Sequence, residues 1–271
     1  MKNRRFSITT FLGVVSGFGL FVGAIMKSTD NFMIFVSVNS AIMVLGGTLA
    51  ATMISYHGLY VLSSLKGIFS IIFPFHVSPK KLNQDTLTVI EWSKINSKEG
   101  FKAVENIISS KKIKDPLILY ARDLISTGVK GEKLKTLLGD LIDSMTEREM
   151  IQPNILLTMA GFSPGFGMVG TLIGLVIMLD NMGGDISQIG PGLALALITT
   201  LYGVLFAQLI FKPSAEKMMQ TIQIMRHRNV ILAETLVLLS LGKTSFEIQD
   251  EINRYIAPKN WIDLTKTDGG K

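Results

Sequence analysis

Three threonines in apolar surroundings are the side chains of this sequence whose type and spacing best suit chemistry. Thr171 lies in one long uncharged stretch, and Thr199 and Thr200 lie together in the next. A threonine hydroxyl in a membrane helix usually donates to a carbonyl of its own helix. Hydroxyls at a common depth can also replace water around a small cation, because hard cations prefer oxygen ligands. The pattern leaves two interpretations open, local back-bonding or a transient sodium site.

Pro164 is the second feature of interest. It stands seven residues before Thr171, and therefore nearly on the same face of a helix. A proline inside a helix removes one backbone donor and leaves the Ala160 carbonyl without its usual partner. Neighbouring helices or water can satisfy such a carbonyl in a membrane protein. A tolerated kink and a hinge beside a hydrated path both fit this position.

Charged side chains are absent from the four longest apolar stretches of the sequence, residues 6–26, 32–55, 154–179 and 186–211. A charge at the centre of a bilayer costs about 2.5–3.5 kcal/mol on insertion scales, and proton relays accept this cost to hold a titrating group. This chain holds no such group in these stretches. If it moves protons or sodium, the carboxylate that carries the ion must belong to another subunit.

These stretches also predict the fold class. Apolar residues make up 48% of the 271 residues, and charged residues only 18%. A helix needs roughly 20 apolar residues to cross a hydrocarbon core of about 30 Å, and each stretch is long enough. We therefore predict an all-α integral membrane protein with four transmembrane helices, which excludes a soluble enzyme. The sequence has no cysteine, so disulfide scaffolds and thiol catalysis are excluded as well.

The charges outside these stretches predict the topology. The segment 56–153 holds 14 basic and 11 acidic residues, and the tail from residue 212 holds nine and seven. The short turns at 27–31 and 180–185 have no basic surplus. Membrane proteins keep excess Lys and Arg on the cytoplasmic side, so both termini and the middle segment are expected in the cytoplasm. This placement accounts for the net charge of +6 without a nucleic-acid partner.

The predicted organisation has four parts. Two transmembrane hairpins, within residues 1–55 and 154–211, flank a cytoplasmic insertion at 56–153, and a tail follows at 212–271. Apolar residues at helical spacing predict that the insertion and the tail are helical.

Small residues recur at steps of three and four in the last two apolar stretches. They form one face of each helix, namely Ala160, Ser163, Gly167, Gly170 and Gly174 in one, and Gly192, Ala196, Thr199, Gly203 and Ala207 in the other. Small residues let helix backbones approach closely in lipid. We expect these helices to pack tightly against each other or against a partner.

Several runs of residues resemble one known family. Ser163-Pro-Gly-Phe-Gly-Met-Val-Gly-Thr171 resembles the third helix of the flagellar stator A-subunit, the MotA/PomA family. Ile189-Gly-Pro-Gly-Leu-Ala-Leu-Ala-Leu-Ile-Thr-Thr-Leu-Tyr-Gly203, followed by Phe211-Lys-Pro213, resembles its fourth helix. Leu45-Gly-Gly-Thr-Leu-Ala50 resembles part of the second. The resemblance covers the chain from about residue 8 to residue 257.

This resemblance implies a partner and a location. In the family, a pentamer of A-subunits surrounds a pair of single-span, MotB/PomB-like B-subunits in the bacterial inner membrane. The membrane aspartate of the B-subunit carries the ion, and the cytoplasmic loop of the A-subunit engages the rotor switch protein FliG. The resemblance implies no cofactor other than the transported Na⁺ or H⁺.

It also implies roles for matched residues in the membrane. Pro164 and Pro213 correspond to the prolines that couple ion flow to movement. Thr171, Thr199 and Thr200 match the threonines of sodium-driven members, whereas proton-driven members tend to lack the threonine pair.

The loop and the outer mouth match the family less completely. Lys98 and Glu105 match charges that face the rotor, and a solvated helix face is the alternative interpretation. Ser97 replaces the usual arginine, and Ser37 stands where many members carry an aspartate.

Other functions remain to be distinguished. A proton-driven stator and a TolQ/ExbB-like energiser of envelope transport are the near alternatives, although the latter usually has one span before its large insertion and this sequence has two. A membrane enzyme would need paired carboxylates, metal ligands or a nucleophile with its base. The three histidines, His57, His76 and His227, are dispersed, so we predict that the chain is not an enzyme. A purely structural scaffold is the third class.

Overall fold

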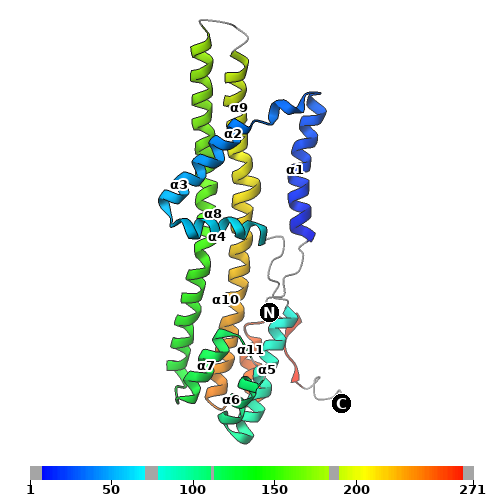
Figure 1. Cartoon of the computed structure of the whole chain (residues 1–271). Coiled ribbons are helices and arrows are strands. Elements are labelled where there is room, and N and C mark those ends of the chain that lie inside the picture. Colours follow the sequence, from blue (N-terminus) through cyan, green and yellow to red (C-terminus); the bar gives the residue numbers. More distant parts are fainter. Residues whose placement is uncertain (1–7, 71–78, 111–112, 183–188, 265–271) are drawn as a thin grey trace. The chain divides into compact units, whose positions relative to one another are not determined.

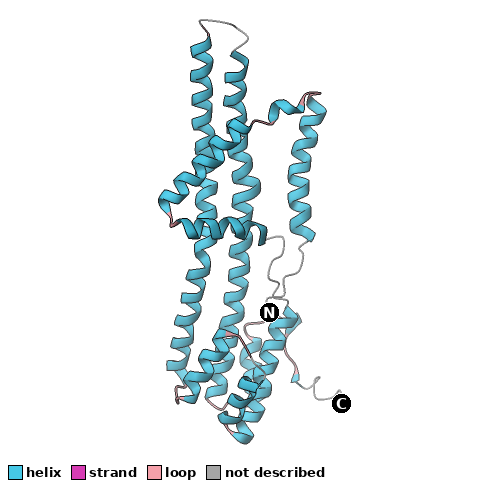
Figure 2. Cartoon of the chain, viewed as in Figure 1, coloured by secondary structure: helices cyan, strands magenta, loops and turns pink. Residues whose placement is uncertain are grey.

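The computed structural model describes residues 8–70, 79–110, 113–182 and 189–264, and the regular elements in these ranges are all helices (Figure 2). This confirms the predicted all-α fold. The chain divides into two compact units. We call Met1–His76 with Glu149–Thr221 the membrane unit, and Val77–Arg148 with Ile222–Lys271 the insertion–tail unit.

Four apolar helical segments among the described residues are long enough to cross a membrane, as predicted. The first is α1 (Ile8–Ser28) and the second covers Phe32–Ser55. The second is composed of the 3-10 helix η1 (Phe32–Phe35), α2 (Val38–Ala41), the π-helix η2 (Ile42–Gly46) and α3 (Gly47–Ser55). The third lies in α8 (Gly131–Asn181), and the fourth runs through α9 (Ile189–Leu205), the π-helix η4 (Phe206–Phe211) and α10 (Lys212–Ser240) (Figure 1).

The last two helices are longer than the apolar stretches suggest. The predicted span 154–179 is only the C-terminal part of α8, which begins at Gly131. Hydropathy marks where apolar side chains begin, whereas the backbone hydrogen bonds of α8 continue back through a charged sequence. Residues 6–7 and 186–188 of the predicted spans, and 183–185 of the second turn, lie outside the described residues.

The membrane unit has an apolar core where α8 meets the end of the fourth span. Its buried side chains are Val61, Ile155, Leu156, Met159, Phe211 and Ala215. The helix α4 (Gly58–Ser70) packs here. Two polar contacts join this part of the unit to α8: the Tyr56 hydroxyl lies 3.1 Å from the Thr158 hydroxyl, and the Gln152 amide donates to the Ser63 hydroxyl at 2.9 Å.

The insertion–tail unit contains the helices α5 (Pro79–Glu99), α6 (Phe101–Ser110), α7 (Pro116–Ser126), α11 (Ser245–Asn253) and η5 (Pro258–Asn260). The beginning of α8 and the end of α10 complete it. Its main cluster of buried apolar side chains includes Val89, Trp92, Val104, Leu117, Leu134, Leu138, Leu232 and Leu236. Gly128 and Gly242 end α7 and α10 with φ angles of 88° and 70°, which glycine adopts without strain. The predicted helical character of insertion and tail is thus confirmed.

Candidate functional site

The backbones of α8 and α9 approach each other closely (Figure 1). A Cβ atom on Gly174 would lie 2.6 Å from the Ala196 nitrogen and from the Gly192 oxygen. A Cβ on Gly192 would lie 2.9 Å from the Gly174 oxygen. These distances are too short for a side chain, so glycine is required on both helices.

The same contact continues further along the pair. A Cβ on Gly203 would lie 2.8 Å from the Ser163 oxygen and 3.2 Å from the Pro164 Cα, and one on Gly167 would lie 3.0 Å from the Thr199 oxygen. The buried Ser163 hydroxyl donates to the Gly203 carbonyl at 3.0 Å. The small-residue faces predicted from sequence therefore meet each other in the structure.

Thr171 and Thr200 come together across this interface. Their hydroxyl groups are hydrogen-bonded to each other. The Thr171 hydroxyl also lies 3.0 Å from the Ala196 carbonyl oxygen and 3.2 Å from that of Gly167, and the Thr200 hydroxyl lies 3.4 Å from both carbonyls. Four oxygen atoms are thus gathered at one place, and both threonines are partly exposed in this chain. Such a cluster offers the ligand type that a hard cation prefers.

Thr199 is placed differently from the other two threonines. Its side chain is 0% exposed, and its hydroxyl donates to the Leu195 and Ala196 carbonyls of its own helix, at 2.9 and 3.0 Å. A Cβ on Gly170 would lie 2.5 Å from the Thr199 Cβ, so this side chain packs where Gly170 leaves space. Thr199 therefore fills the helix interface, while Thr171 and Thr200 reach across it.

Both predicted coupling prolines lie inside helical runs. Pro164 lies within α8. Pro213 is the second residue of α10 and follows the π-helix η4, whose last turn is closed by a hydrogen bond from the Lys212 N–H to the Ala207 carbonyl. Because proline has no N–H, the Leu209 carbonyl loses the donor that a regular helix would supply. The backbone is therefore irregular where the fourth span ends.

Tyr202 is a residue that the sequence analysis missed. Its hydroxyl donates to the Phe35 carbonyl at 2.7 Å and accepts from the Ser37 N–H at 3.2 Å. Ser37 itself caps α2, since its hydroxyl oxygen accepts from the Ser40 N–H at 3.2 Å. A tyrosine in an apolar helix needs a partner for its hydroxyl, and this was the available signal. Tyr202 joins α9 to the beginning of the second span.

The two predicted rotor-facing residues lie in the insertion–tail unit. Lys98 is exposed near the end of α5, and Glu105 is partly exposed in α6. Ser97 donates its hydroxyl to the Ser93 carbonyl of its own helix at 3.0 Å.

Metal-binding clusters of three or more His, Asp or Glu side chains are not found among the described residues. His57 lies beside Tyr60, with ring centroids 6.3 Å apart, and His76 lies outside the described residues. The oxygen cluster of Thr171 and Thr200 is the candidate ion site because it gathers four oxygen atoms at one place.

Comparison with known proteins now assigns the family. Residues 107–229 match the model of the MotA/TolQ/ExbB proton channel family. The chain is 32% identical over 212 residues to Motility protein A of Aquifex aeolicus, an alignment that covers 78% of this chain and 81% of that protein. The chain belongs to the MotA/PomA family of flagellar stator A-subunits. Like its relatives, this A-subunit is a member of a channel family rather than of an enzyme family.

Two further similarities agree with this assignment. The A-subunit is 29% identical over 216 residues to the chemotaxis protein PomA of Vibrio alginolyticus, covering 78% of this chain and 80% of PomA. Its fold matches a chain of the flagellar MotAB stator complex from Bacillus subtilis with a TM-score of 0.82 at 17% identity, covering 98% of this chain and 100% of that one.

Proposed function

We propose that this A-subunit forms, with a B-subunit, an ion channel that converts a transmembrane ion gradient into torque on the flagellar rotor. The observation that carries the proposal is the oxygen cluster of Thr171 and Thr200, which lies in a helix pair whose spans contain no charged residue. Such a pair can line an ion path but has no titrating group of its own. The carboxylate then comes from the B-subunit.

The proposed mechanism follows because the A-subunit supplies oxygen ligands and the B-subunit supplies the carboxylate. An ion binds the membrane aspartate of the B-subunit beside Thr171 and Thr200. The bound ion neutralises that charge and so changes its preference among the surrounding A-subunits, which form a homopentamer. The ring then steps around the B-subunits, and Lys98 and Glu105 push on the rotor switch protein FliG. This arrangement requires the inner membrane, with both termini in the cytoplasm.

Sodium is the ion that the site supports best. Both hydroxyls of the cluster can ligate a cation that has lost part of its water, and PomA is among the similar proteins. Swimming speed should rise with external sodium and resist a protonophore at alkaline pH. Speed that ignores sodium and collapses with the protonophore would identify a proton-driven stator instead.

The motor assignment itself is tested by deleting the gene. The deleted strain should assemble flagella that do not rotate, and the wild-type gene should restore rotation. Normal swimming of the deleted strain, in a cell with no second stator, would exclude a motor role and favour the TolQ/ExbB-like alternative. Loss of envelope transport with normal swimming would establish that alternative.

A further inference from the structure

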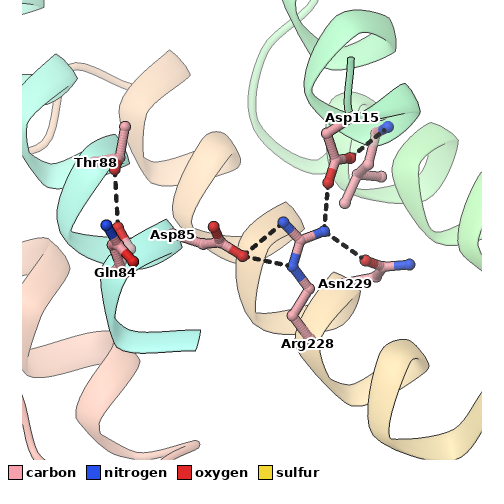
Figure 3. A network of polar contacts seen from close by, with 7 residues as sticks. Gln84, Asp85, Thr88, Asp115, Arg228 and Asn229 are labelled. Atoms are coloured by element: carbon pink, nitrogen blue, oxygen red, sulfur yellow. Dashed lines mark hydrogen bonds and ion pairs between the residues drawn. The ribbon is translucent and has the colours of Figure 1, made fainter. Parts of the chain in front are cut away.

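Arg228 of α10 is a buried cation held by two carboxylates (Figure 3). Its side chain donates from Nε and Nη2 to one oxygen of Asp85 in α5, at 2.9 and 2.7 Å. Its Nη1 donates to Asp115 at 2.6 Å and to the side-chain oxygen of Asn229 at 3.0 Å. Burial lowers the pKa of Arg228, but the charges and hydrogen bonds of Asp115 and Asp85 raise it by more than burial lowers it. The net shift of the pKa is therefore upward, and the group stays charged.

Asp115 connects this cation to a third helix. Its Oδ2 accepts from Arg228, and its Oδ1 accepts from the Leu117 N–H at 3.0 Å as the N-cap of α7. Arg228 therefore joins α10 to α5 and to the first turn of α7 at a single point.

A second polar contact between α5 and α10 has the same alignment of the two helices as the Asp85–Arg228 pair. The Asn96 side chain donates to the Leu239 carbonyl at 3.1 Å. Asp85 and Arg228 are 143 residues apart in the sequence, as are Asn96 and Leu239. The two contacts are thus separated by the same number of residues on both helices, about three turns, and the helices run parallel without slip.

Apolar side chains pack between these two contacts. Val89 and Trp92 of α5 share a core with Leu232 and Leu236 of α10. The hydrophobic effect is non-directional, so burial of these side chains specifies the register less sharply than a directional polar contact does. The fork of Arg228 donates in fixed directions to its carboxylates, and it therefore selects one position of α5.

We propose that Arg228 is a positioning residue for the rotor contact, because together with the Asn96–Leu239 contact it fixes the register of the helix that carries Lys98. Lys98 stands two residues after Asn96, at the end of α5. The inference rests on the proposed stator function. Arg228 acts on the rotor contact through α5, and its hydrogen bonds to Asp85, Asp115 and Asn229 all lie within the insertion–tail unit.

The chain offers a matched control on the same helix. Arg226 pairs with Asp143 at 3.0 Å, but these side chains are 45% and 61% exposed. An exposed pair contributes little. Arg226→Met should therefore behave as wild type, while Arg228→Met removes the register contact.

The test measures position and torque in the same full-length variants, in membranes with the B-subunit. Because the natural sequence has no cysteine, spin labels can be attached to cysteines introduced at Glu99 of α5 and Gln223 of α10, and their distance distribution recorded by pulsed dipolar spectroscopy. Stall torque per stator is measured by counting steps as single stators join the motor. Arg228→Met should broaden the label distance distribution and lower the torque per stator at least twofold, and Arg228→Lys should restore part of both.

The possible outcomes distinguish a failure of the positioning role of Arg228 from a failure of the proposed stator function. An unchanged distance distribution and wild-type torque per stator in Arg228→Met, with only fewer stators in the membrane, would overturn the positioning role. If Arg228→Met fails to reach the membrane, Arg228→Lys and Asp85→Asn decide by the same two measurements. Failure of the stator function itself shows differently, as normal rotation in the deleted strain.

Discussion

The hydroxyl groups of Thr171 and Thr200 are hydrogen-bonded to each other across α8 and α9. Two carbonyl oxygens, those of Gly167 and Ala196, lie within 3.4 Å of both hydroxyls. The neighbouring Thr199 donates to its own helix instead. The three threonines therefore provide a built-in comparison between a hydroxyl that crosses the interface and one that does not.

Valine substitutions at these positions test the ion site. Thr171→Val or Thr200→Val keeps the side-chain shape and removes one oxygen, and a lost hydrogen bond to a charged group costs about 1.5–3 kcal/mol. The sodium concentration that gives half-maximal swimming speed should rise about tenfold or more. Thr199→Val is the control and should leave it nearly unchanged. Equal shifts in all three variants would contradict a specific role for the crossing pair.

Alanine substitutions test the close approach of the helices. Gly174→Ala would place its Cβ 2.6 Å from backbone atoms of α9, which cannot retreat without separating the helices. Overpacking of this kind costs about 1–3 kcal/mol, so the melting temperature of the purified chain in detergent should fall. Gly165→Ala is the control, because nothing in the described chain lies within 4 Å of its added Cβ. A lower melting temperature for Gly165→Ala than for Gly174→Ala would refute this packing.

Replacing Pro213 tests the coupling role. Pro213→Ala returns an N–H that can bond to the Leu209 carbonyl, and the π-helix η4 should then convert to a regular α-helix. Rotation of tethered cells should be impaired while immunoblots show normal amounts in the membrane. Pro153→Ala also returns an N–H, but in the part of α8 before the predicted span. Tethered cells that carry this variant should rotate normally. Normal torque in Pro213→Ala would remove that proline from the coupling mechanism.

Charge reversal tests the rotor contact. Lys98→Glu and Glu105→Lys change exposed or partly exposed positions, so the chain should fold and reach the membrane. Torque or stator recruitment should nevertheless fall, because the proposed contact with the rotor depends on charge. Lys130→Glu, in the turn before α8, is a suitable control. Wild-type torque in both reversed variants would exclude Lys98 and Glu105 from the interface.

The pKa of Glu247 predicts a pH effect on the tail. Hydrogen bonds from Lys243, from the Thr244 N–H and from the Thr244 hydroxyl lower this pKa from 4.5 to about 2. A carboxyl whose pKa is lowered by folding stabilises the fold at pH values above its pKa in the unfolded chain. This contribution is lost as the pH falls from 4.5 towards 2. The melting temperature of wild type should exceed that of Glu247→Gln at pH 6, and the difference should shrink below pH 4.5. A difference that grows on acidification would contradict the assignment, and Glu99→Gln is the control.

The sequence alone predicts the four spans, because a bilayer demands long uncharged stretches and the chain supplies four. It does not predict that α8 begins at Gly131, since a charged sequence can form one continuous helix with the apolar stretch that follows it. The sequence also does not predict that Thr200 reaches across the helix interface while Thr199 bonds to its own helix. Adjacent residues on a helix differ by about 100° in direction, and which of them crosses an interface depends on how two helices are rotated against each other.

Contacts between distant residues were the other part that sequence reasoning missed. Arg228 meets carboxylates 143 and 113 residues away, and no local pattern marks either partner. The glycines, in contrast, could be recognised, because a repeat of small residues at helical spacing is itself the requirement for close packing.

The first helix, α1, makes few contacts with the rest of its chain. None of the 21 residues of α1 is buried within its own chain, although α1 does contact η4, where a Cβ on Gly17 would lie 3.4 Å from the Leu209 side chain. Most of the surface of α1 is therefore left to acyl chains and adjoining molecules. Extraction into detergent replaces these surroundings, so we expect the setting of α1 to depend on the choice of amphiphile.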